Sequence, residues 1–111
     1  MMKNIWEEIR SNGMNQDLDM YTIKKNGNRG LWFNLKIDGN CVVVSPSKFN
    51  NPSITISAQR NIRYDEFERV AKQYDSWRAG MVKRSYLGSL SMNSSYIFGM
   101  MNYFHMKHLS H

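Results

Sequence analysis

The side chains that could do chemistry in this 111-residue chain gather in its last third. Between positions 76 and 111 there is no Asp or Glu, but there are four basic residues: Arg78, Lys83, Arg84 and Lys107. The remaining residues carry eleven Lys and Arg against nine Asp and Glu, so +4 of the net charge of +6 belongs to this segment. Such asymmetry is typical of phosphate-binding surfaces, although a basic, solvated helical layer has the same composition.

Residues 82–101 resemble a helix-turn-helix DNA-binding segment. Val82–Leu90 would be its first helix, Ser91–Met92 its turn and Asn93–Met101 its recognition helix. Apolar residues stand at the positions that such a motif buries, namely Tyr86, Leu90, Met92, Ile97 and Met100. The family has a small residue where Leu87 stands and usually glycine where Ser91 stands. A core helical hairpin is the alternative interpretation, because any such hairpin can share this apolar spacing.

The resemblance implies a division of roles within this segment. Arg78, Lys83 and Arg84 would neutralise phosphates of the DNA backbone. The free backbone N–H groups at the start of the last helix could bind a further phosphate. Three polar residues would face base edges: Asn93, Ser94 and Ser95. For Asn93 and Ser94 the alternative role is simply to cap the helix.

The last helix itself suggests a second function. It has almost no polar face, so it is either the central core helix or half of a subunit interface. Met and aromatic side chains at this density suit adaptable contacts, with a homodimer partner or around an apolar ligand pocket. The residues that we expect at such an interface are Tyr96, Met100, Met101 and Phe104.

Trp32 offers a further nucleic-acid surface. In a strand it points opposite to Phe33 and could stack on an unpaired base beside Lys24 and Lys36. It could instead pack under the amino-terminal helix. The chain lacks the glycine-aromatic strings of an RNA-recognition sheet, which favours packing.

The remaining reactive side chains do not form a recognisable catalytic group. His105, His108 and His111 lack the converging third or fourth ligand that a metal site needs. Cys41, the single cysteine, lies in an apolar segment typical of a buried thiol. No Gly-rich phosphate loop or nucleophile elbow occurs. We therefore expect a binding protein without metal or cofactor rather than an enzyme.

The first half of the chain predicts a helix followed by strands. Apolar spacing over 4–12 predicts a short helix that ends in a left-handed cap at Gly13 and covers a sheet. Alternating apolar residues then predict strands over about 20–24 and 31–37, and a two-residue Asp38–Gly39 turn returns the chain antiparallel. The segment 53–57 is expected to supply the fourth strand of a meander.

The second half predicts helices. A helix is expected from the acidic residues near position 65 to Gly80, which stands where a cap is expected. Its apolar residues form one stripe: Phe67, Val70, Ala71, Tyr74 and Trp77. Further helices are expected over 82–90 and from Asn93 or Ser94 to about 108. The predicted fold is α+β: a short amino-terminal helix, a four-stranded antiparallel meander and two or three carboxyl-terminal helices packed on one face.

Composition bounds the rest. With 41% hydrophobic and 22% charged residues, the chain has ordinary globular composition, and its length suits one domain over residues 1–111. The amino terminus lacks the apolar run of a signal peptide, and no stretch approaches the ~20 apolar residues of a membrane span. These features and the lone cysteine favour a cytoplasmic location.

Overall fold

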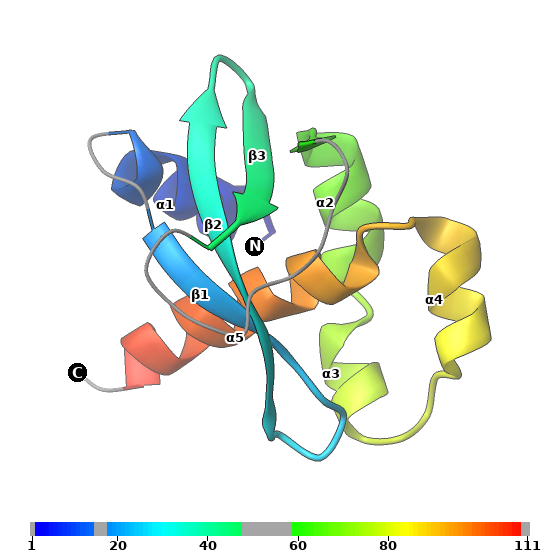
Figure 1. The fold of residues 1–111 in the computed structure, drawn as a ribbon. Helices are drawn as coiled ribbons and strands as arrows, with labels where there is room; N and C mark the ends of the chain where they lie inside the picture. Colours follow the sequence, from blue (N-terminus) through cyan, green and yellow to red (C-terminus); the bar gives the residue numbers. More distant parts are fainter. Residues whose placement is uncertain (1, 15–17, 48–58, 110–111) are drawn as a thin grey trace.

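The structure, a computed structural model, describes residues 2–14, 18–47 and 59–109. The fold is α+β, as the sequence predicts: an amino-terminal helix, a four-stranded antiparallel sheet and carboxyl-terminal helices (Figure 1). Its elements are α1 (Met2–Gly13), β1 (Leu18–Ile23), β2 (Arg29–Asp38), β3 (Cys41–Pro46), β4 (Arg60–Ile62), α2 (Tyr64–Ala71), α3 (Tyr74–Arg78), α4 (Arg84–Leu90) and α5 (Ser94–Leu109).

The strands follow one another in the order β1-β2-β3-β4, which confirms the predicted meander. Apolar partners such as Leu35 and Val44 face each other across β2 and β3. Asp38 pairs with Cys41, so the turn residues are Gly39 and Asn40, one position later than the sequence predicts. Gly39 has φ +60° and no non-glycine residue that the structure describes has a positive φ, a pattern that fits a type II′ turn.

The fourth strand lies at a different place from the one predicted. The segment 53–57 is outside the described residues, and the strand that pairs with Val42–Val44 is Arg60–Ile62. With three residues and one apolar side chain, Ile62, this strand is too short to display the period-2 alternation that identifies strands in sequence.

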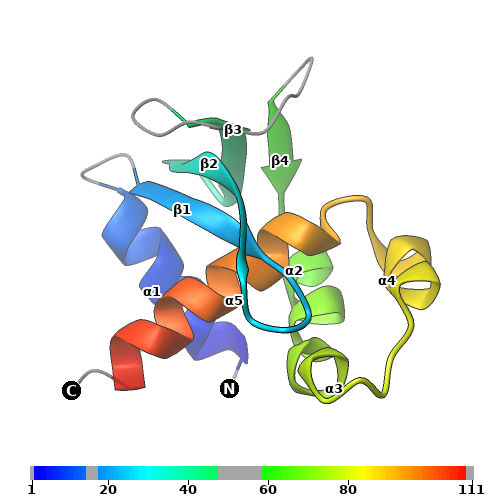
Figure 2. The same cartoon turned by 60° about the horizontal axis from the view of Figure 1, so that its bottom comes forward.

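In the described part of the chain the helices lie on one side of the sheet (Figure 2). Helix α5 runs across β1 and is contacted by α1, α2 and α4, so it occupies the centre of the molecule. Its side chains from Ile97 to Met101 are all buried. Over this part of α5 the apolar side chains are thus covered within one chain.

Gly13 does not form the predicted left-handed cap. It is a buried residue within α1, and a Cβ there would lie 2.8 Å from Cγ1 of Ile37. The missing side chain lets α1 approach β2 closely, which is a tertiary requirement that local sequence does not reveal.

The helix predicted up to Gly80 is divided in two. The chain bends at Lys72 and Gln73, where the Gln73 N–H bonds the Val70 carbonyl at 2.9 Å in a tighter turn. The predicted apolar stripe is nevertheless entirely buried. Beyond the bend, Trp77 stacks on Phe98 of α5 with ring centroids 4.6 Å apart, so the bend preserves one core across α2 and α3.

Candidate functional site

Two turns bring basic side chains together beside α4. The β1–β2 hairpin reaches the connection between α3 and α4 in both ribbon views (Figures 1 and 2). Arg78 Nη2 lies 3.1 Å from the position that a Cβ on Gly27 would take, and Lys25 Nζ lies 3.4 Å from the corresponding position on Gly80. The chain therefore forms one surface from residues more than fifty positions apart in the sequence.

Backbone hydrogen bonds set the direction of both turns. In the hairpin, the Gly27 N–H donates to the Lys24 carbonyl at 2.8 Å, with Gly27 at φ +93°. After α3, the Gly80 and Met81 N–H groups donate to the carbonyls of Trp77 and Ser76 at 3.0 and 2.9 Å, which is a Schellman motif with Gly80 at φ +79°. This confirms the predicted cap at Gly80 and directs the chain towards α4.

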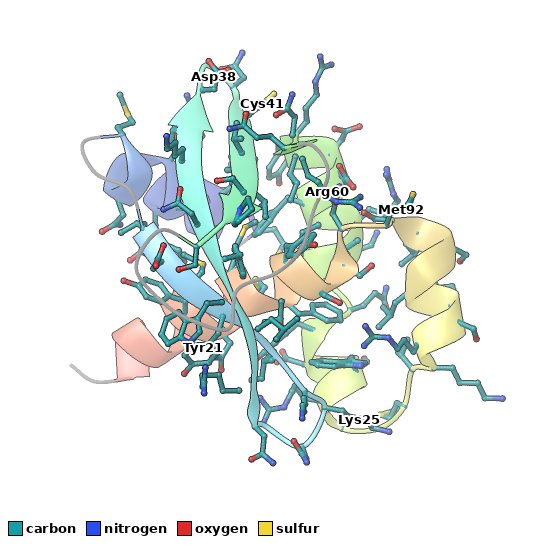
Figure 3. The ribbon with its side chains drawn as sticks, in the orientation of Figure 1. Tyr21, Lys25, Asp38, Cys41, Arg60 and Met92 are labelled. Carbon is teal, nitrogen blue, oxygen red and sulfur yellow. The ribbon has the colours of Figure 1, made fainter. Side chains whose placement is uncertain are left out.

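The surface between these turns and α4 is hollowed into three adjoining depressions of about 340, 540 and 500 Å³. The first two share Trp77, Arg84 and Ser95, and the last two share Lys24 and Lys25, so they form one continuous groove. Figure 3 labels a residue near each end, Lys25 on the hairpin and Met92 between α4 and α5.

Five exposed cations border what we call the cationic groove: Lys24, Lys25, Arg78, Lys83 and Arg84. None of the described residues that border it is a carboxylate. A fourth hollow, beside α1 and β3, has both signs of charge, with Glu7 and Asp65 among Lys3, Arg10 and Arg63. The cationic groove should therefore attract an anion more strongly than the fourth hollow does.

The sequence predicts Arg78, Lys83 and Arg84 at a phosphate-binding surface, but it does not identify Lys24 and Lys25 as their partners. The available signal was the pair of lysines directly before Asn26 and Gly27, because a turn of this type projects its side chains into solvent. Which helix the turn would meet could not be deduced from that pair.

Of the three residues expected to read bases, Ser94 and Ser95 border the groove and Asn93 is turned away from solvent. Asn93 is buried, and its Nδ2 donates to Glu66 Oε2 at 2.9 Å. Ser94 Oγ donates to the Leu87 and Ser91 carbonyls at 3.0 and 2.9 Å. The expectation that Asn93 faces a base edge is thus wrong, because its amide anchors the α4–α5 turn to α2.

The helix-turn-helix geometry is also not present. Between Ser94 and Phe104 the residues of α5 are buried or only partly exposed, whereas a recognition helix presents an exposed face to the major groove. Tyr86 and Met92, which that motif would bury, are 49% and 81% exposed, whereas Leu87 is buried. Of the five apolar positions, only Ile97 and Met100 are fully buried, and both belong to α5.

The residues expected at a subunit interface belong to the internal core. Met100, Met101 and Phe104 are 0%, 7% and 1% exposed. Tyr96 is half-buried and packs edge-to-face on Phe33 of β2, with centroids 5.5 Å apart. Met100, Met101 and Phe104 are thus covered by the protein's own sheet and helices, and Tyr96 is covered in part.

The sequence left open that Trp32 packs under α1. In the structure it does not. Phe33 points towards α5, so its neighbour Trp32 points to the opposite face of the sheet. There its ring contacts Tyr21 edge-to-face at 5.2 Å, and the Arg29 guanidinium lies 5.5 Å from the ring centroid. Trp32 is thus half-covered by its own neighbours.

No family model, curated protein or solved structure matches this chain. Among the described residues, no group of three or more His, Cys, Asp and Glu side chains converges as metal ligands would. None of the helices in that part of the chain combines the length and apolar character needed to cross a bilayer. The cationic groove is the surface from which function can be inferred.

Proposed function

We propose that this protein binds nucleic acid through the cationic groove, with backbone phosphates contacted by its five basic residues. The observation that carries the proposal is the concentration of these cations on one hollowed surface, with no carboxylate among the described residues that line it. Every one of them is exposed to solvent, so each can meet a phosphate at the surface.

The extent of the groove favours a polymer over a small anion. Its cations come from the hairpin, the end of α3 and the start of α4, and they are distributed over adjoining depressions rather than around one point. A chain of phosphates can engage such a series of cations together, and each neutralised phosphate releases counterions. Binding should therefore weaken steeply as salt is added.

Removing three groove lysines tests the proposal. We expect the variant Lys24→Ala/Lys25→Ala/Lys83→Ala to bind a labelled DNA of mixed sequence about tenfold more weakly at low ionic strength. The slope of log K against log salt should also become shallower by about 2–3. Fluorescence anisotropy over a salt series measures both quantities.

The matched control is Lys3→Ala/Lys36→Ala/Lys72→Ala, which removes the same charge from outside the groove. Its affinity and slope should stay close to those of the unmodified protein. If both variants lost affinity equally, the loss would follow from the lower net charge alone, and a site specific to the groove would be contradicted. No binding of single-stranded or duplex DNA at low ionic strength would overturn the proposed function.

A further inference from the structure

The groove changes character along its length. Lys24, Lys25 and Arg78 surround the depression at the hairpin end. At the other end, four largely buried apolar residues lie at the base of the first depression: Ile23, Trp77, Leu87 and Phe98. A polyanion in the groove would therefore meet cations at one end and an apolar pocket at the other.

One face of α4 forms the wall of this apolar pocket. Arg84, Leu87 and Gly88 line it, and their spacing of i, i+3 and i+4 places them on a single helical stripe. Ser91, directly after the end of the helix, lines the pocket as well. Gly88 has no atom within 4 Å of the position that a Cβ would take, so it leaves the pocket open beside the helix.

The pocket also presents polar groups at its rim. Arg84 Nη2 donates to Ser95 Oγ at 3.1 Å, which holds the guanidinium where the apolar pocket joins the cationic part of the groove. Arg84 and Ser95 supply donors and an acceptor of the kind that the edges of nucleobases engage. At about 340 Å³, the pocket lies within the range of small-ligand sites.

We propose that the groove receives an unpaired nucleotide, with its base in the apolar pocket and the adjoining phosphates on the cations. This inference rests on the proposed function and specifies the nucleic acid as single-stranded. In a duplex the bases are stacked inside the helix, and flipping one out costs a few kcal/mol. In a single strand the bases are free to enter a pocket, so the groove should select single strands.

Three labelled probes of equal length test this inference: a single strand, its duplex and a strand without bases. The unmodified protein should bind the single strand about tenfold more tightly than either of the other two. Gly88→Leu should abolish this preference by filling the pocket, while binding of the baseless strand stays unchanged. Gly88→Leu should remain folded because the position is open and leucine favours helix.

Ser89→Leu is the matched control, because this exposed position lies on the opposite face of α4. It should keep the preference for the single strand. If the unmodified protein binds all three probes equally, or if Gly88→Leu leaves the preference intact, the base pocket is overturned while the cationic groove stands. Loss of binding in the triple-lysine variant is the separate test of the groove itself.

Discussion

Replacing Gly99 with alanine is expected to lower the free energy of unfolding by about 2–3 kcal/mol. Gly99 is where α5 crosses β1, and a Cβ there would lie 2.7 Å from the Tyr21 carbonyl oxygen and 3.0 Å from Cε1 of Phe33. The first of these atoms belongs to the backbone, so relief requires α5 to move away from the sheet. Urea denaturation followed by tryptophan fluorescence measures the change.

Gly88→Ala is the matched control for this prediction. It makes the same substitution in the neighbouring helix α4, where nothing lies within 4 Å of the added Cβ. Alanine should then stabilise the protein by about 0.5–1 kcal/mol through its higher helix propensity. Equal effects of the two substitutions would contradict the close contact between α5 and β1.

Replacing Glu66 with alanine is expected to destabilise the protein by about 2 kcal/mol. Its carboxylate on α2 accepts hydrogen bonds from Ser91 Oγ and from Asn93 Nδ2, and Ser91 Oγ accepts the Asn93 N–H at 2.8 Å. Without Glu66 the buried Asn93 amide loses its partner. The same urea experiment measures this loss.

Glu68→Ala is the control on the same helix. Glu68 is exposed and accepts a hydrogen bond from the Tyr64 hydroxyl at 3.0 Å, so its removal should change stability by no more than about 0.5 kcal/mol. Glu66→Ala should in addition weaken nucleic-acid binding, because the α4–α5 turn that it anchors leads into Ser95, whose Oγ accepts a hydrogen bond from Arg84 at the groove. A Glu66 variant as stable as the Glu68 variant would show that the turn is held by other contacts.

The candidate site could be predicted only in part. Arg78, Lys83 and Arg84 are recognisable from the sequence because an absence of carboxylates around them is a local property. Their partners Lys24 and Lys25 are not, because that association depends on where the hairpin meets the end of α3. Asn93 has the residue type and position of a base-reading or capping side chain, and its contact with Glu66 is what gives it a structural role.

The fold class, the antiparallel meander and the apolar stripe of α2 and α3 follow from the sequence alone. Apolar residues recur every two residues in a strand and about every 3.6 residues in a helix, and this local spacing indicates which side of each element is buried. The tertiary structure decided what covers each buried side. The apolar α5 carries the same pattern whether it packs inside one chain or between two, and only its contacts with β1, α1 and α2 make it the central helix. The groove arises in the same way, because charges distant in sequence become neighbours only when turns and helices pack.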